Sequence, residues 1–306
     1  MHDDSGTQEA KPAPPGFTRE QWERFDREGY LVIEDAIEPE AVRRYREALA
    51  RIASRNPKYR REAFFGPQNA VTLDAELEEL IDHPRHTGFA YDLYGELTKL
   101  HLSQLLMRPR NSSHNIWHPD GARALPFQVF SPRLPLQFKV GYWLTDLPRA
   151  RMGNLTVLPR SHRMQYMNGY DTHEPVEGEH VLCLKAGAMT LLHCSTWHRV
   201  EPNESETIRE NLFLSYCPAW INPEDRYTND PAWLAKLTRE RRILMRSYGH
   251  PYTNTKPPAE DFPLFLDRAS GADRDPGVYR EHVELHRRKR VTQVERWLAE
   301  EAKQSL

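Results

Sequence analysis

Short strand-like runs separated by turn residues fill the middle of the chain, and they constrain its fold more than any other feature. Each run is rich in apolar, β-branched and aromatic residues, and Pro, Gly or Asn lies between successive runs. The runs are 100–107, 113–117, 136–144, 155–158, 180–184, 189–193 and 208–216. Many short strands with turns between them are typical of a β-sandwich or a jelly roll. We therefore predict a β-rich core over about residues 100–220.

Helical patterns lie on both sides of this core. Thr18 and Gln21 form a capping-box pattern ahead of a helix that should end at Gly29. A strand is expected at 30–34, and further helical stretches are expected at 41–54, 74–82, 87–97, 231–248 and 278–303. Residues 1–16 are polar and rich in Pro and Ala, which predicts a disordered tail. Helices at both ends favour one domain over 17–306, mainly β with helical additions (α+β), with a helical extension over about 221–306.

Composition narrows the class of protein. The 306 residues are 39% hydrophobic and 28% charged, which suits a globular core. The 42 basic and 44 acidic residues nearly balance, so nothing supports a nucleic-acid or membrane binder. Cys183, Cys194 and Cys217 are too scattered for a disulfide framework. No run approaches the roughly 20 apolar residues of a membrane span, and no signal-peptide pattern is present. We expect a cytoplasmic protein.

Three His-x-Asp/Glu pairs are candidates for a metal site. They are His2/Asp4, His118/Asp120 and His282/Glu284. The first pair lies in the expected tail, and the third lies in an expected helix, where residues two apart point to nearly opposite faces. His118 and Asp120 leave the end of an expected strand, where residues two apart share a face. This pair can chelate one ion, and a second His would complete the facial set that leaves positions open on Fe(II).

The distal ligand should follow a later core strand. The candidates are His162, His173, His180, His193 and His198. Gly187 opens an apolar strand, His198 follows at its far end, and Arg209 begins the next strand eleven residues later. An Arg fork binds a carboxylate through two hydrogen bonds, and 2-oxoglutarate offers a distal carboxylate. The spacing therefore predicts an Fe(II) site of His118, Asp120 and His198, with Arg209 as the 2-oxoglutarate anchor.

Four blocks of sequence carry a resemblance to a known family. They are the Phe-Thr-x-Glu-Gln…Gly-Tyr-Leu-Val-Ile segment from residue 17, 117-WHPDG-121, 153-GNLTVLPRSHR-163 and 198-HRVEPNESETIR-209. Over about residues 17–220 the chain resembles the phytanoyl-CoA dioxygenase (PhyH-like) family of Fe(II)/2-oxoglutarate-dependent oxygenases. The last block matches the family pattern His-x4-Asn-x-Ser-x3-Arg in full. The third departs from it, because Asn154 precedes Leu155 and Arg160 replaces a Gly before Ser161. That departure affects a turn rather than a ligand.

The resemblance implies a double-stranded β-helix, which is a jelly-roll, cupin-like core with the metal inside its mouth. It also implies that 2-oxoglutarate chelates the iron through its keto acid end while Arg209 holds the other end. Strand residues that should line the same cavity are further candidate contacts for 2-oxoglutarate, with ordinary packing as the alternative. These residues are Gln137, Lys139, Trp143 and Thr156.

The resemblance also implies a reaction. Fe(II) is the expected cofactor, 2-oxoglutarate and O2 are the expected cosubstrates, and ascorbate should support turnover in vitro. Halogenating relatives carry a small residue in place of the ligand carboxylate, so an intact Asp120 favours hydroxylation of an unactivated C–H bond, with release of succinate and CO2. Desaturation, epoxidation or cyclisation in secondary-metabolite tailoring use the same ligands and remain open.

Arginines interleaved with aromatic residues flank the expected mouth. The arginines are Arg60, Arg61, Arg108, Arg110, Arg123 and Arg133. Such loops can cover an anionic, partly apolar small molecule, and a solvated basic loop is the alternative. The substrate contacts that we expect are Arg110, Trp117, Arg123, Phe127 and Phe130. A monomer and a homodimer are both compatible with the sequence.

Three other functions fit parts of this pattern. An O2-activating enzyme that works without 2-oxoglutarate would share the ligands but would not need Arg209. A non-catalytic jelly-roll module that binds a ligand would leave the complete His, Asp and His set unexplained. A zinc hydrolase would need a positioned general base beyond the ligands, and the sequence offers none.

Overall fold

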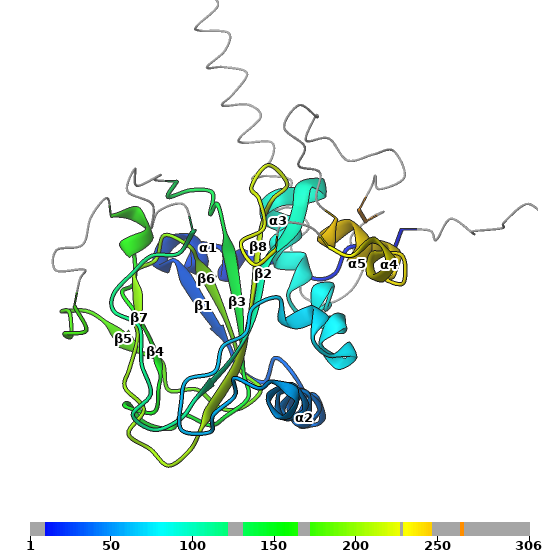
Figure 1. Cartoon of the computed structure of the whole chain (residues 1–306). Coiled ribbons are helices and arrows are strands. Elements are labelled where there is room, and N and C mark those ends of the chain that lie inside the picture. Colours follow the sequence, from blue (N-terminus) through cyan, green and yellow to red (C-terminus); the bar gives the residue numbers. More distant parts are fainter. Residues whose placement is uncertain (1–9, 122–130, 165–171, 227–228, 247–263, 266–306) are drawn as a thin grey trace, which may run out of the picture.

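Two antiparallel sheets form the centre of the molecule. The computed structural model describes residues 10–121, 131–164, 172–226, 229–246 and 264–265. The larger sheet has the order β1 (Tyr30–Ile33), β6 (Met189–His193), β3 (Phe138–Trp143), β8 (Arg209–Pro218) and β2 (Thr98–Arg108). The smaller sheet has the order β5 (His180–Val181), β4 (Leu155–Val157) and β7 (His198–Val200). The two sheets face each other, which is the expected jelly-roll arrangement (Figure 1).

Helices cover the outer face of the larger sheet (Figure 1). The longer ones are α1 (Arg19–Glu28), α2 (Pro39–Arg55) and α3 (Thr87–Tyr94), and two short ones follow the sheets, α4 (Pro231–Leu234) and α5 (Arg239–Met245). Short 3-10 helices span Ala70–Thr72, Ala75–Ile81, Gly95–Leu97 and Ser161–Arg163. Within the described ranges, no helix combines the length and the apolar character that a membrane span requires.

Alternation along the strands separates a packing face from a cavity face. In β8, Leu212, Leu214 and Tyr216 join the core beneath the helices. Arg209 and Phe213 point the opposite way and line a cavity between the sheets. Because successive side chains of a strand point to opposite faces, one strand supplies both the core and the site.

The start of the chain forms as its local pattern predicts. The side chain of Thr18 accepts a hydrogen bond from the backbone N–H of Gln21, and the Gln21 side chain accepts one from the Thr18 N–H. This capping box satisfies two N–H groups that have no partner inside the helix. Gly29 takes a left-handed conformation with φ 81°, which ends α1 and leads into β1.

A buried imidazole ties α3 to the sheet. Tyr216 donates its hydroxyl hydrogen to the carbonyls of Leu80 (3.2 Å) and Ile81 (3.0 Å), so its oxygen accepts from His86 Nε2 at 2.6 Å. His86 Nδ1 then accepts from the Tyr142 hydroxyl at 2.7 Å. Burial lowers the pKa of His86 well below its usual value, with a further lowering from His83. The network therefore requires a neutral imidazole in one tautomer.

Several expected elements differ in the structure. Residues 113–117 do not form a regular strand, because their backbone bonds go to scattered partners such as the Thr172 carbonyl. The expected helix over 231–248 is interrupted between α4 and α5, where Thr238 takes an extended conformation with ψ 161°. The helical stretch expected at 74–82 is a 3-10 helix over Ala75–Ile81. The strand β7 was not expected, and the helix expected at 278–303 lies outside the described residues.

The expected N-terminal tail is too long. Residues 10–16 pack against the body of the protein, where Ala13 is only 1% exposed. The backbone N–H of Lys11 donates to Glu240 Oε1 at 3.2 Å. Order therefore extends at least to residue 10, and the rest of the expected tail lies outside the described residues.

Candidate active site

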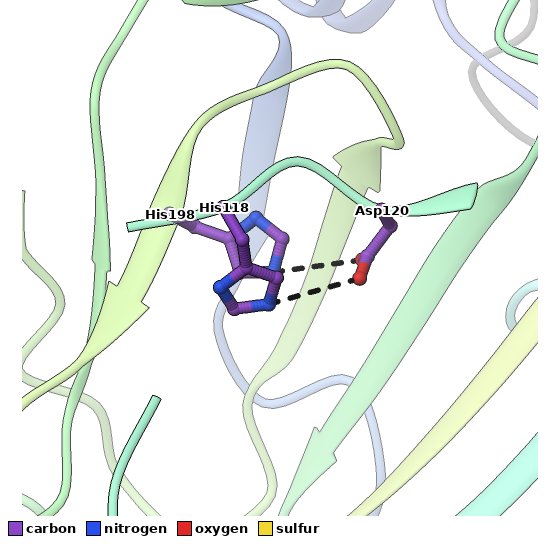
Figure 2. A group of neighbouring side chains, drawn as sticks. All are labelled: His118, Asp120 and His198. Carbon is purple, nitrogen blue, oxygen red and sulfur yellow. Dashed lines mark ion pairs between the residues drawn. The ribbon is translucent and has the colours of Figure 1, made fainter. Parts of the chain in front are cut away.

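Backbone pairing brings the three expected metal ligands together. His198 is the first residue of β7, and His118 pairs with it through two backbone hydrogen bonds of 2.9 and 3.0 Å. The N–H of Asp120 donates to the Cys194 carbonyl at 2.8 Å, just beyond β6. The ligand atoms of the three side chains all lie within 4.8 Å of one another. Both imidazoles face the Asp120 carboxylate (Figure 2).

Hydrogen bonds fix which ring nitrogen faces the site. His118 Nδ1 donates to the Ile116 carbonyl at 2.7 Å, and His198 Nδ1 donates to the Thr196 carbonyl at 2.9 Å. Each Nε2 therefore keeps its lone pair and points toward Asp120, at 3.9 Å from Oδ1 for His118 and 3.5 Å from Oδ2 for His198. An imidazole whose other nitrogen bonds to a backbone carbonyl is held in the orientation that metal ligation needs.

The charges of the site favour ligation at neutral pH. Burial lowers the pKa of His198 to about 3, so the ring is neutral there. Burial alone would raise the pKa of Asp120, but Lys139 and the two neighbouring imidazoles together outweigh it and hold the pKa well below its usual range. A deprotonated carboxylate and two neutral imidazoles are the forms that bind a divalent ion. This donor set fits Fe(II) with open positions.

Lys139 lines the cavity, as expected, and lies at the metal site. It points into the cavity from β3 and forms an ion pair with Asp120 Oδ2. Its ammonium also lies 5.1 Å from the centre of the Phe213 ring. The structure therefore places Lys139 beside the carboxylate ligand.

Gln137 supports the loop that carries Asp120. Gly121 has φ 63°, and a Cβ there would lie 2.6 Å from Gln137 Oε1. Only glycine fits this turn without strain. The Gln137 carbonyl also accepts from the Cys194 N–H at 3.1 Å. Gln137 thus lies behind the loop and does not line the cavity, contrary to expectation.

Arg209 lies in the same cavity as the three ligands. The cavity has a volume of about 240 Å³. The Arg209 side chain is 1% exposed, and Nη1 donates to the Gly153 carbonyl at 2.7 Å. Nε and Nη2 have no hydrogen-bond partner among the described residues. Burial lowers the pKa of Arg209 well below its usual value, and Arg108 lowers it further. A buried guanidinium edge without a partner needs an anionic ligand.

Arg108, expected only among the arginines that flank the mouth, is a second buried cation of this cavity. It ends β2 directly opposite Arg209 and lines the same cavity, with Nε and Nη1 unpaired among the described residues. Burial lowers the pKa of Arg108 to about 10. The strand pattern contained the signal, since a strand extended by one residue beyond 107 places Arg108 on the cavity face with Leu106.

The Asn-x-Ser part of the last sequence block builds the turn before Arg209. Asn203 donates to the carbonyls of Arg108 and Thr207, both at 2.8 Å. Its Oδ1 accepts from the backbone N–H and the hydroxyl of Ser205 at 3.0 and 2.7 Å. One amide thereby holds the end of β2 and the start of β8, which places both arginines.

The other two expected contacts for 2-oxoglutarate do not line the cavity. Leu155 takes the cavity position on β4, so Thr156 points to the opposite face. Trp143 lies behind Arg209, whose guanidinium is 5.4 Å from the centre of the indole rings. The indole N–H donates to Thr190 Oγ1 at 3.1 Å. Trp143 therefore supports the anchor from behind.

The expected substrate contacts do not gather at the cavity. Trp117 is buried and donates its indole N–H to the Glu174 carbonyl at 2.9 Å. Arg110 is exposed and forms an ion pair with Glu206. The remaining three, Arg123, Phe127 and Phe130, lie outside the described residues.

Solved structures share this fold. HygX from Streptomyces hygroscopicus with nickel and 2-oxoglutarate bound is 17% identical, with a TM-score of 0.58 over 68% of this chain and 90% of that one. The non-heme α-ketoglutarate-dependent carbocyclase SnoK from nogalamycin biosynthesis is 20% identical, with a TM-score of 0.55 over 68% and 87%. The epimerase SnoN from the same biosynthesis is 22% identical, with a TM-score of 0.53 over 64% and 81%.

Sequence comparison identifies the family directly. No curated protein sequence matches the chain significantly. The sequence profile of the family described as phytanoyl-CoA dioxygenase (PhyH) matches residues 25–211, which is more than half of the chain and contains all three ligand candidates and Arg209. The expected family is thereby confirmed. The chain belongs to the phytanoyl-CoA dioxygenase family of Fe(II)- and 2-oxoglutarate-dependent oxygenases.

Proposed function

We propose that this chain binds one Fe(II) through His118 Nε2, Asp120 and His198 Nε2, and binds 2-oxoglutarate through Arg209. With these bound, it hydroxylates an unactivated C–H bond of a small molecule and releases succinate and CO2. The observation that carries the proposal is the unpaired edge of Arg209, buried in the same cavity as the three ligand side chains. A zinc hydrolase, or an oxygenase that uses no 2-oxoglutarate, binds no carboxylate that would pair with these Arg209 nitrogens.

The arginine pair suits the distal carboxylate of 2-oxoglutarate. Arg209 offers Nε and Nη2, and Arg108 offers Nε and Nη1 from the facing strand. A carboxylate has lone pairs for all four donors. The keto acid end of the same molecule then reaches the metal, because both ends share one cavity. HygX, a relative in fold, binds 2-oxoglutarate and nickel, which supports this assignment.

The bound iron supplies, with O2 and 2-oxoglutarate, the oxidising power for C–H cleavage. The protein fixes the geometry around it. Backbone bonds orient both imidazoles, and Lys139 holds one oxygen of Asp120. Leu155 and Leu192 give the cavity an apolar wall, which favours a water-poor site once the substrate is bound.

Ring closure or epimerisation is the second candidate outcome. The folds of SnoK, a carbocyclase, and SnoN, an epimerase, are similar to this one. The ligand carboxylate of Asp120 is present, which argues against a halide ligand in its place. Hydroxylation, cyclisation and epimerisation all remain compatible with it. We propose a small-molecule substrate and a cytoplasmic location for the enzyme.

Two measurements test this function. Metal-free protein that receives Fe(II) and 2-oxoglutarate without O2 should develop a visible charge-transfer absorption band, and on adding air and ascorbate it should form succinate. The His198→Ala variant should lose both signals, because only two ligands remain. A wild-type protein that binds Fe(II) yet shows no 2-oxoglutarate-dependent band would exclude the proposed function.

A further inference from the structure

One carboxylate stands apart from the metal site on the wall of the same cavity. Glu224 lines the cavity from the loop after β8, and its side chain is 48% exposed. The described residues give its carboxylate one ionisable partner, His101 Nε2 at 3.3 Å. The cations that line the described wall are engaged elsewhere in the cavity, Lys139 at Asp120 and the two arginines at the proposed anchor.

The loop that carries Glu224 is fixed against β2. The N–H of Glu224 donates to the His101 carbonyl at 3.0 Å. The next residue, Asp225, is buried and accepts from the Ser103 N–H at 2.8 Å. Arg226 pairs with Asp225 at 2.6 Å and donates to the Leu100 carbonyl at 2.5 Å. Three successive residues thus bind one strand, and the Glu224 side chain lines the cavity from a rigid support.

Strand register places Glu224 at the opposite end of β2 from the anchor. Lys139, which pairs with Asp120, and Leu102 are both in register with Ser215. The backbones of β3 and β2 at this level are therefore two strand spacings apart, about 10 Å. Arg108 lies seven residues beyond His101 on β2, about 20 Å along the strand. Glu224 and the two anchor arginines therefore lie at opposite ends of the cavity, where they can contact different molecules.

The surface between Glu224 and the metal is apolar with neutral polar groups. On this stretch of the cavity wall Leu102 and Phe213 supply apolar contacts, and Gln68 and Gln104 supply amides. A carboxylate accepts hydrogen bonds only, and its bonds to charged donors are about twice as strong as neutral ones. An anionic substrate group at this position would instead be repelled by Glu224.

We propose that Glu224 binds a protonated amine of the substrate, on a molecule whose apolar part lies across β2 toward the metal. This inference rests on the proposed function, because it takes the metal as the place of oxidation. It replaces the expected anionic substrate with a cationic one. His101 Nε2 lies 3.3 Å from one oxygen of this carboxylate and so borders it on one side.

Matched probes test the proposal directly. The protein is loaded with Zn(II), which is redox-inert, and with 2-oxoglutarate. The dissociation constants of 3-phenylpropylamine, 3-phenylpropan-1-ol and 3-phenylpropanoate are then measured by ligand-observed NMR at low salt. The amine should bind about fivefold more tightly than the alcohol, which is the upper end of the scale for one half-exposed ion pair. Added salt should reduce the difference.

Two variants complete the experiment. Glu224→Gln should bring the amine and the alcohol to within about twofold, since the amide keeps the shape but not the charge. Glu204→Gln is the matched control, because Glu204 is an exposed carboxylate that pairs with Arg151 and does not line the cavity. Tightest binding of the carboxylate, equal affinities for the three probes, no binding of the amine, or an unchanged preference in Glu224→Gln would overturn the proposal. Failure of 2-oxoglutarate to bind the metal-loaded protein would instead overturn the proposed function.

Discussion

The burial of Arg209 is the residue-scale feature that points most directly to an anionic ligand. A guanidinium that is 1% exposed and leaves two nitrogens unpaired among the described residues destabilises a folded protein. Its retention in a cavity beside the metal candidates is understandable if an anion binds there. The cost of burial in the ligand-free protein is offset when the carboxylate arrives.

Replacing Arg209 should separate stability from binding. Arg209→Met removes the charge-assisted bonds to 2-oxoglutarate, so the affinity for 2-oxoglutarate should fall about 100-fold, or about 2.7 kcal/mol. Metal affinity should change little, because Arg209 does not contact the three ligand side chains. The thermal midpoint of the ligand-free protein should not fall, since a buried unpaired charge is removed. Calorimetric titration with Mn(II) and then 2-oxoglutarate measures both affinities.

Arg108→Met is the informative comparison. Arg108 lines the same cavity from the facing strand, and its loss should weaken 2-oxoglutarate binding roughly tenfold. Unchanged 2-oxoglutarate affinity in Arg209→Met would remove Arg209 from its assigned role, whatever Arg108 does.

The turn between β7 and β8 is the element that sets the distance from the metal to the anchor. Asn203 makes four hydrogen bonds there and joins the ends of two strands. The sequence pattern named Asn203 and Ser205 without giving their role, and the structure supplies it as turn geometry. A motif residue can therefore be required without touching any ligand.

Asn203→Ala should destabilise the fold by about 2 kcal/mol, because buried carbonyls and N–H groups lose their partner. Urea unfolding measures the change. The control is Asn229→Ala, since Asn229 donates a single bond to the Met245 carbonyl at 2.8 Å, and its loss should cost about 1 kcal/mol or less. Equal costs for the two variants would show that the Asn203 network does not hold the turn.

The link between α3 and the sheet should make stability depend on pH. The pKa of His86 lies well below its unfolded value, so the unfolded chain binds a proton that the folded protein rejects. The free energy of unfolding should therefore be highest above about pH 6.5, the pKa of a histidine in the unfolded chain. It should fall as the pH drops through that value, by about 1.4 kcal/mol between pH 7.5 and 5.5.

His86→Gln isolates this contribution. The variant should be less stable at pH 7.5, because the bonds to the hydroxyls of Tyr142 and Tyr216 are weakened. Its unfolding free energy should fall less steeply than that of the wild type between pH 7.5 and 5.5. Parallel curves for the two proteins, measured by urea unfolding at both values, would show that His86 is not the titrating group.

At the scale of the whole molecule, the sequence predicts the fold class because strand alternation and turn residues are local signals. The capping box at Thr18 and the strand from Tyr30 follow from the same local rules. The expected strand at 113–117 fails because tertiary partners, not local pattern, decide the backbone bonds there. His118 still reaches its place, since pairing with His198 over a long sequence separation orients it.

Site residues that follow a sequence spacing could be predicted from the sequence. Those that tertiary packing brings to the cavity could not. His118, Asp120, His198 and Arg209 come together as their spacing and the family pattern indicate. Glu224 reaches the cavity only because Asp225 and Arg226 bind its loop to β2, which no local pattern reveals. Thr156 was misplaced because neighbouring residues of a strand point to opposite faces. Gln137 lies just before the first residue of β3, where strand alternation does not fix its side chain.

The central claim is that two imidazoles and one carboxylate bind a single ion beside a 2-oxoglutarate molecule held by Arg209. A crystal grown without O2 in Fe(II) and 2-oxoglutarate tests it through anomalous diffraction at the iron absorption edge. One strong peak should lie at coordination distance from His118 Nε2, Asp120 and His198 Nε2, with the distal carboxylate of 2-oxoglutarate against Arg209. A peak elsewhere, or a 2-oxoglutarate molecule whose carboxylate avoids Arg209, would contradict this account.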